Sequence, residues 1–179
     1  MSNLNVKIKK LSDLAVIPSY QKHGDAGLDL VATSKFYDEY GCVCYGTSLA
    51  FEIPNGYVGL LFPRSSNTKK DLILGNSVGV LDSGYRGEVF LKFKPARPDY
   101  TISEDFISEK NEDGYWRLSK QESDLNGYNI GDKIGQIIII PIPQVNFIEA
   151  DELSSSDRGV GGFGSTDPIT KSIEENFSA

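Results

Sequence analysis

Short apolar runs separated by turn residues follow one another along most of this 179-residue chain. Runs of this length, rich in β-branched and aromatic residues, are typical of strands. The pattern therefore predicts a mostly β protein with a strand in each run. The runs are Val6–Ile8, Leu49–Ile53, Tyr57–Phe62, Val89–Phe93, Ile134–Ile142 and Val145–Ile148.

Local features refine this prediction. Residues 54–56, Pro-Asn-Gly, lie between two runs, and Asn and Gly accept the positive φ angles of tight turns, so we expect Phe51 and Val58 on paired strands. The β-branched run Gln136–Ile140 predicts a strand that is buried on both faces. Amphipathic helices are nearly absent, and we expect at most one short helix, at Ser66–Asp71, with its first serine as the N-cap.

Residues 95–127 break the rhythm of short runs. They contain four basic and eight acidic side chains, and four minus eight gives a net charge of −4. We expect an exposed insertion here, with Tyr115–Leu118 adding a strand to a hairpin. Beyond Asp157 the chain is rich in glycine and then polar, which predicts a mobile C-terminal arm. The expected organisation is one β domain over residues 1–156, which contains the insertion, and an arm over residues 157–179.

Composition and charge exclude several classes of function. The net charge of −7 and the isoelectric point near 4.7 argue against binding to nucleic acid or to anionic membranes, because both need clustered positive surface. The sequence has no apolar stretch of signal-peptide or membrane-span length, so we expect a cytoplasmic protein. Cys42 and Cys44 would point to the same face of a strand and could not easily bridge, so we expect free thiols.

The histidine content restricts the chemistry further. His23 is the single histidine, so a zinc site with several histidines is excluded, and the two cysteines lack the spacing of a zinc deaminase. His23 also lacks the flanking motif of a Ser-His-Asp enzyme. A hydrolase with this composition is expected to use carboxylates and a hard metal ion.

Two segments contain polar side chains that suit a chemical role. Asp25–Leu30 alternates polar and apolar residues, so a strand here would bury Ala26 and both leucines and leave its two aspartates on the opposite face. Phe62–Ser66 joins a guanidinium, two hydroxyls and free backbone N–H groups, which is phosphate-binding chemistry. Two solvated carboxylates and a capped turn with a surface arginine are the structural alternatives.

Two further segments are rich in glycine. Gly79–Glu88 places three glycines around Asp82 and Tyr85, which predicts a tight hairpin with the aspartate at its turn. Residues 157–166 hold four glycines, one phenylalanine and two hydroxyls, but no lysine precedes Ser165, so a Walker P-loop is disfavoured. A plain hairpin and a flexible linker are the alternatives for these segments.

Taken together, five segments resemble the five motifs of the trimeric dUTPase family, in the family's order: Asp25–Leu30, Pro63–Ser66, Asn76–Glu88, Gly131–Gln136 and Arg158–Thr166. The resemblance implies a dUTPase-like fold of the β-barrel or jelly-roll type, also called a β-clip. It implies an enzyme that hydrolyses dUTP to dUMP and pyrophosphate with Mg²⁺, which limits uracil incorporation into DNA and supplies dUMP for thymidylate synthesis. It also implies a homotrimer whose active sites are shared between subunits.

The resemblance assigns roles within the third motif. Asp82 matches the carboxylate that activates the attacking water, and a carboxylate is a suitable base for a water held nearby. Tyr85 matches the aromatic residue that packs on deoxyribose and excludes a 2′-hydroxyl. Asn76 and the backbone between Gly79 and Tyr85, which includes Leu81, match the hairpin that reads the polar edge of uracil and excludes the methyl group of thymine.

The remaining motifs supply contacts to metal, base and phosphates. Asp29 matches the residue that holds the hydration shell of Mg²⁺, and this indirect contact suits a cation that gives up its waters reluctantly. Phe163 matches the aromatic residue that covers uracil. The residues that match phosphate contacts are Arg64, Ser65, Ser66 and Gln136 in the domain and Arg158, Gly164, Ser165 and Thr166 in the arm.

Two alternatives to a plain dUTPase belong to other classes. A dCTP deaminase, or its bifunctional form, shares the fold but should lack the complete Gly-Phe-Gly arm and this third motif. A regulatory protein on a dUTPase scaffold would use the acidic insertion at residues 95–127 to contact a protein partner. The second role need not exclude catalysis.

Overall fold

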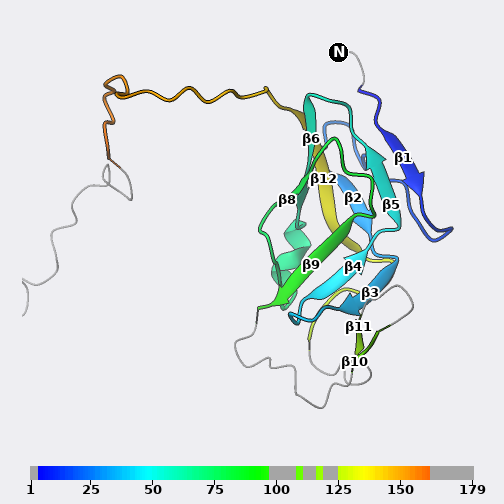
Figure 1. Ribbon diagram of the computed structural model, residues 1–179. Helices are drawn as coiled ribbons and strands as arrows, with labels where there is room; N and C mark the ends of the chain where they lie inside the picture. Colours follow the sequence, from blue (N-terminus) through cyan, green and yellow to red (C-terminus); the bar gives the residue numbers. More distant parts are fainter. Residues whose placement is uncertain (1–3, 97–107, 111–115, 119–124, 162–179) are drawn as a thin grey trace, which may run out of the picture. The chain divides into compact units, whose positions relative to one another are not determined.

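The structure is a computed structural model that describes residues 4–96, 108–110, 116–118 and 125–161 (Figure 1). Contacts between residues divide the chain into two units, Met1–Gln144 and Val145–Ala179. All strands of the described residues lie in the first unit. The domain boundary predicted between residues 156 and 157 stays a prediction. Among the described residues, no helix is long and apolar enough to cross a membrane.

Two four-stranded antiparallel sheets make up most of the first unit (Figure 1). The first sheet has the order β2-β12-β6-β8, with the bounds Leu28–Val31, Lys133–Pro141, Tyr57–Phe62 and Gly79–Leu81. The second has the order β3-β4-β9-β7, with the bounds Ser34–Tyr37, Val43–Gly46, Phe90–Pro95 and Leu72–Leu74. Two further antiparallel pairs are β1 with β5, Lys7–Lys10 and Leu49–Glu52, and β10 with β11, Ser108–Lys110 and Trp116–Leu118.

Both sheets contribute to one apolar core. Leu30 and Ile137 of the first sheet belong to the same cluster of buried side chains as Tyr45 and Phe93 of the second. No ladder joins the two sheets among the described residues, so they are not closed into a barrel. The prediction of a mostly β, jelly-roll-type fold is confirmed in this open form.

Five of the six strands predicted from apolar runs are present, as β1, β5, β6, β9 and β12. The sixth prediction, at Val145–Ile148, is wrong. There, Val145, Phe147 and Ile148 are 66%, 93% and 84% exposed, and the segment pairs with no described strand. Apolar content alone predicted the strand, but a strand also needs a hydrogen-bonded neighbour for its backbone.

The strand pairing predicted across residues 54–56 is also wrong. The turn itself forms, since Tyr57 N donates to Pro54 O at 3.2 Å and Gly56 has a φ of 84°. However, β5 pairs with β1, whereas β6 pairs with β12 and β8, so Phe51 and Val58 lie in different sheets. The turn carries the chain from one sheet to another instead of closing a hairpin.

β12 is not buried on both faces as predicted. Ile137 is 1% exposed and lies in the core, whereas Ile140 is 37% exposed. The β-branched residues suit a central strand, because β2 and β6 pair with β12 on its two sides. The core, however, covers only one face of that strand.

The predicted helix is a short 3-10 helix, η1, at Ser65–Lys69. It begins one residue before the predicted start, and Arg64 stands at the N-cap position. No side chain caps it, so the capping role predicted for Ser66 is wrong. Ser66 instead lies within the helix.

Two further strand predictions need correction. β2 begins at Leu28, so Ala26 is exposed and Asp25 lies before the strand, where its carboxylate accepts a backbone hydrogen bond at 2.8 Å. Gly79–Glu88 forms no hairpin, because β8 pairs with β6 of the first sheet and the chain continues into β9 of the second. Asp82 does lie at a turn, as predicted.

The insertion is described in part. The strand predicted at residues 115–118 is present as β11 over residues 116–118, and it pairs with β10. The remaining residues between 97 and 124 lie outside the described part of the chain.

Cys42 and Cys44 are free, as predicted, and both are buried. Burial, together with the charge of Asp38, raises the pKa of Cys44 to about 12. The same two causes raise the pKa of Cys42. Both thiols therefore stay protonated at neutral pH, which disfavours a nucleophilic or metal-binding role for them.

Candidate active site

The strand register brings residues of three motifs together. On the antiparallel strands β2, β12 and β6, Gln136 lies opposite Asp29 on one side and opposite Phe62 on the other. Directly opposed residues of neighbouring strands share a face of the sheet. Arg64 lies two residues beyond Phe62 and so returns to that face. The first, second and fourth motifs therefore meet at one end of β6.

Asp29 is the electrostatic centre of this cluster. Its side chain is only 12% exposed, and each oxygen pairs with one cation: Arg64 Nε lies 2.8 Å from Oδ1 and Lys133 Nζ lies 2.8 Å from Oδ2. A guanidinium has five N–H donors, and this ion pair uses one of them. The carboxylate therefore orients Arg64 while leaving most of its donors for an anion.

Lys133 is the candidate that the sequence analysis missed. It belongs to the fourth motif, begins β12 and faces the same carboxylate as Arg64. The sequence did contain a signal for it, because Lys133 is a cation in the motif from which Gln136 was assigned to phosphate contacts. Its partner depends on a register shift between Lys133 and Gly135, an irregularity that the residue pattern does not reveal.

Gln136 is held in place by its neighbours. Its Nε2 donates to Pro63 O at 3.2 Å, which ties the fourth motif to the second. A Cβ atom at Gly27 would overlap Gln136 Oε1, so the side chain depends on a glycine in the first motif. Gln136 therefore presents its amide beside Arg64 in a defined position.

η1 carries the two serines of the second motif. Ser65 is exposed and Ser66 is half-buried, directly after Arg64. Their hydroxyls add neutral donors to the charged donors of the Asp29 cluster. Arg64, Ser65, Ser66 and Gln136, predicted as phosphate contacts, therefore lie on neighbouring elements.

The third motif forms a separate turn. Tyr85 N donates to the backbone oxygen of Asp82 at 3.1 Å, and the Asp82 side chain is exposed. Tyr85 is 46% exposed, and its hydroxyl donates to Glu88 O at 3.0 Å. A Cβ atom at Gly87 would overlap the Tyr85 hydroxyl, so this glycine leaves room for the ring.

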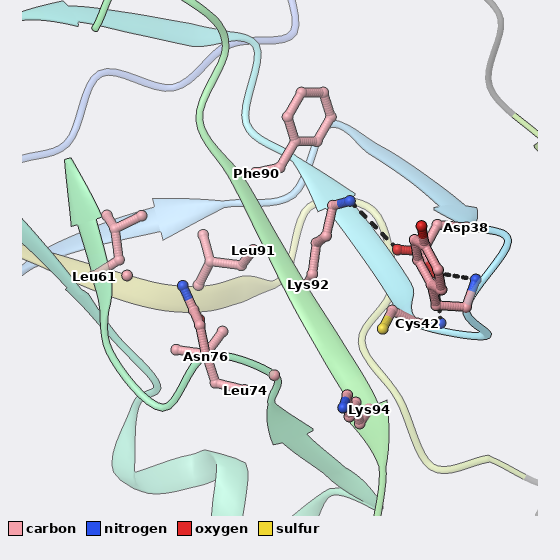
Figure 2. Close-up of a pocket in the computed structure, with 12 residues that line it drawn as sticks. Asp38, Cys42, Leu61, Leu74, Asn76, Phe90, Leu91, Lys92 and Lys94 are labelled. Carbon is pink, nitrogen blue, oxygen red and sulfur yellow. Dashed lines mark hydrogen bonds and ion pairs between the residues drawn. The ribbon is translucent and has the colours of Figure 1, made fainter. Parts of the chain in front are cut away.

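Asn76 and Gly79 line a cavity of about 530 Å³ (Figure 2). Leucine side chains of β6 and β9 form part of its wall. An ion pair between Lys92 Nζ and Asp38 Oδ2, 3.3 Å long, lies across the cavity from Asn76 (Figure 2). Neither Asp82 nor Tyr85 lines this space. The cavity is therefore lined by only some of the residues of the predicted nucleotide site.

Asp38 has a structural role in this wall. Burial alone would raise its pKa, but hydrogen bonds from the backbone N–H groups of Cys42 and Tyr40 and the ammonium of Lys92 outweigh burial and hold the pKa below its usual value. The carboxylate is therefore charged at neutral pH, and it accepts hydrogen bonds from groups of its own chain.

Within one chain, the turn of the third motif lies far from the Asp29 cluster. Leu81 pairs with Gly59 near the start of β6, so Asp82 lies level with Val58, six residues before Arg64. At about 3.3 Å per strand residue, six residues separate Asp82 from Arg64 by about 20 Å. The two side chains of one chain are therefore too far apart to act on the same phosphate.

The fifth motif lies in the second unit. Arg158 Nε donates to Gly161 O at 3.1 Å. Phe163, Gly164, Ser165 and Thr166 lie outside the described residues, so their roles stay predictions.

The donor set can be compared with the needs of Mg²⁺. No group of three or more His, Cys, Asp or Glu side chains gathers within the described ranges. Each carboxylate oxygen of Asp29 forms an ion pair with one cation and keeps a second lone pair that can accept a hydrogen bond. Because two cations compete for this carboxylate, it is a poor direct ligand but can accept a hydrogen bond from a metal-bound water. These residues fit the predicted indirect contact.

Comparison with known proteins identifies the family. The family model described as dUTPase matches residues 13–101. The deoxyuridine 5′-triphosphate nucleotidohydrolase of Clostridium acetobutylicum is 34% identical over 166 residues, which cover 91% of this chain and 97% of that protein. The protein of the same name from Nautilia profundicola is 36% identical over 165 residues, which cover 91% and 99%. The chain belongs to the dUTPase family.

Solved structures share the fold. The dUTPase of Staphylococcus bacteriophage 80alpha with dUpNHpp matches with a TM-score of 0.67 and 29% identity, covering 90% of this chain and 97% of that one. A dUTPase from phage phi11 of S. aureus, described for its coordination of a structural Mg(II) ion, matches with a TM-score of 0.58 and 27% identity, covering 83% and 97%. A second phi11 structure, described as visualising a species-specific insert, matches with a TM-score of 0.60 and 26% identity, covering 85% and 99%.

Proposed function

We propose that this protein is a dUTP diphosphatase that hydrolyses dUTP to dUMP and pyrophosphate in the cytoplasm. The observation that carries the proposal is the cluster in which Arg64 and Lys133 flank Asp29 beside Gln136. It joins charged donors at one end of β6, which suits a triphosphate. The names of relatives and the dUpNHpp in a structural neighbour support the choice of nucleotide.

Asp82 is the proposed general base. Its carboxylate would accept a proton from the attacking water, while Arg64 and the serines of η1 would donate to phosphate oxygens and stabilise the charge that develops there. Tyr85 would pack on the deoxyribose, and Asn76 with the backbone from Gly79 through Leu81 would read uracil. The pyrophosphate leaves as the bond between the α- and β-phosphates breaks.

Mg²⁺ is the proposed cofactor. When bound, it would neutralise part of the charge on the phosphate oxygens. Asp29 would hold the waters of the ion, a role consistent with its two ion pairs. The structural Mg(II) ion described for the phi11 protein supports metal binding within the family.

A homotrimer with shared sites is the proposed assembly. Because Asp82 and Arg64 of one chain lie about 20 Å apart along β6, a complete site would take them from different subunits. A closed threefold ring then gives three equivalent sites. Phe147 and Ile148, 93% and 84% exposed, leave apolar surface that association would bury. In each site, Arg158, Phe163, Gly164, Ser165 and Thr166 would contact the nucleotide.

Substrate selectivity tests this proposal. The kcat/KM for dUTP is expected to exceed those for UTP, dTTP and dCTP by at least about 10³-fold, because unpaired polar groups and steric exclusion both act against the wrong nucleotide. Pyrophosphate release measured for each nucleotide provides the comparison. A similar kcat/KM for UTP would contradict the role of Tyr85, and ammonia release from dCTP would favour the deaminase alternative.

A second candidate function is protein binding by the acidic insertion at residues 95–127. One observation favours it: the described residues on either side of 97–124 are both joined to Asp71. Ala96 N donates to Asp71 O at 2.8 Å, and Asn126 N donates to Asp71 Oδ2 at 3.1 Å. A segment anchored at one place can vary in length and sequence with little effect on the rest of the fold.

Replacement of residues 97–124 by a short Gly-Ser linker tests this second role. Because Asp71 holds the flanking residues Ala96 and Asn126, kcat/KM for dUTP is expected to stay within about threefold of the wild-type value. Binding to a protein partner in a pull-down should be lost. A full-length variant with the eight acidic residues of 95–127 changed to amides separates charge from length. Equal partner binding by all three proteins would rule this role out.

A further inference from the structure

η1 needs contacts from outside to hold its position. Two of its backbone bonds run from Asn67 N to Arg64 O and from Lys70 N to Asn67 O, each 2.9 Å long. No side chain caps it and none of its residues is buried. A 3-10 helix this short has weak internal hydrogen-bond geometry. The placement of Ser65 and Ser66 must therefore depend on other parts of the chain.

Residues 125–128, at the C-terminal end of the insertion, contact the end of η1. Asn126 Nδ2 donates to Lys69 O at 2.7 Å. In the other direction, Lys70 Nζ donates to Gly127 O at 2.7 Å. Two short hydrogen bonds therefore join the last turn of η1 to this segment.

Tyr128 holds the middle of η1. Its hydroxyl donates to Asn67 Oδ1 at 2.8 Å, and Asn67 Nδ2 donates onward to Leu72 O at 2.8 Å. Tyr128 is buried, and its ring packs edge-on against Tyr45 with 5.7 Å between centroids. The Tyr45 hydroxyl donates to Tyr128 O and accepts from Tyr128 N. Tyr128 thus links η1 to the core.

We propose that Asn126 and Tyr128 are positioning residues for triphosphate binding, an inference that rests on the proposed dUTPase activity. They hold η1 so that Ser65 and Ser66, beside Arg64, keep a fixed geometry toward the phosphates. Neither residue lies in any of the five matched motifs. Binding groups must stay within about 0.5 Å of the productive geometry. Loss of one bond to η1 should therefore weaken phosphate contacts and spare the contacts to the base.

Tyr128→Phe removes the hydroxyl that bonds Asn67 and keeps the packed ring. The dissociation constant for dUpNHpp is expected to rise about 5- to 10-fold, while that for deoxyuridine, which has no phosphates, changes less than about twofold. KM for dUTP should rise by a similar factor as the dissociation constant for dUpNHpp, and kcat should change less. Asn67→Ala removes the same bond together with the bond from Asn67 Nδ2 to Leu72 O, so the double variant should bind little worse than Asn67→Ala alone.

Thr33→Val is the matched control. Thr33 is buried, and its hydroxyl donates to Gly46 O at 3.1 Å with no hydrogen bond to η1. This variant should lower the melting temperature as Tyr128→Phe does, yet leave both dissociation constants unchanged. Amide hydrogen exchange over Ser65–Lys69 gives a readout without nucleotide: exchange should be faster in Tyr128→Phe and unchanged in Thr33→Val.

The outcomes separate this inference from the proposed function. If the wild-type protein hydrolyses dUTP and Tyr128→Phe weakens dUpNHpp and deoxyuridine equally, or weakens neither, the positioning role is overturned. Should Tyr128→Phe fail to fold, Asn67→Ala tests the positioning role by the same comparison of the dissociation constants for dUpNHpp and deoxyuridine. A wild-type protein that neither hydrolyses dUTP nor binds dUpNHpp would contradict the proposed function, and would leave Tyr128 with a structural role alone.

Discussion

Asp82→Asn is expected to lower kcat for dUTP by at least about 10²-fold, a typical share for general-base catalysis. The amide keeps the size of the side chain but cannot take a proton from water at neutral pH. Asp82 is exposed at a turn and lies outside the Asp29 cluster, so the fold and the phosphate contacts should persist. Affinity for dUpNHpp should therefore stay within about threefold of the wild-type value, which separates catalysis from binding.

The control for this substitution is Glu52→Gln. Glu52 is also a surface carboxylate, and it pairs with Lys7 at 2.9 Å in a different part of the first unit. Pyrophosphate release measured under saturating dUTP should be unchanged in this variant. Near-normal turnover of Asp82→Asn in the same assay would transfer the role of base to another group.

The strands were predictable where a local pattern decides their existence. Tyr57–Phe62 is an apolar run of strand length with turn residues before it and Pro63 after it, and β6 has these same bounds. The run at Val145–Ile148 has the same apolar character but forms no strand. The difference lies in available partners, because a strand is stable only where another backbone completes its hydrogen bonds.

Strand partners were less predictable than strands. The residues at 54–56 favour a turn, and a turn forms, yet Phe51 and Val58 lie in different sheets. Turn residues determine local φ and ψ angles. They do not determine which sheet the next strand joins, because that choice depends on the packing of the whole core.

The residues of the candidate site were predictable, but most of their contacts were not. Motif patterns named Asp29 and Arg64, and the structure joins them in an ion pair of 2.8 Å. The second cation, Lys133, reaches Asp29 because β12 contains a register shift. Asn126 and Tyr128 lie outside every motif, and their contacts to η1 arise from segments more than 50 residues apart in the chain.

Asp82→Asn and Arg64→Gln are expected to restore activity to each other when the two variants assemble together. Each alone should lose at least about 10²-fold in turnover, the first by loss of the base and the second by loss of a charged phosphate contact. Lys133 still pairs with Asp29 in the Arg64 variant, so the local fold should hold. Because the two altered positions lie about 20 Å apart in one chain, the proposed shared site takes them from different subunits.

In the experiment, the two variants are unfolded, mixed in equal amounts and refolded, and native mass spectrometry counts the mixed oligomers. With random assembly into closed trimers, about 1/4 of the sites combine an intact Asp82 with an intact Arg64, so activity should reach about a quarter of the wild-type value. The control mixture joins Asp82→Asn with a chain that carries both substitutions. It contains no intact Asp82 and should stay inactive. If each chain built its site alone, no mixed oligomer could hold a complete site, so abundant mixed oligomers without recovered activity would refute the shared site.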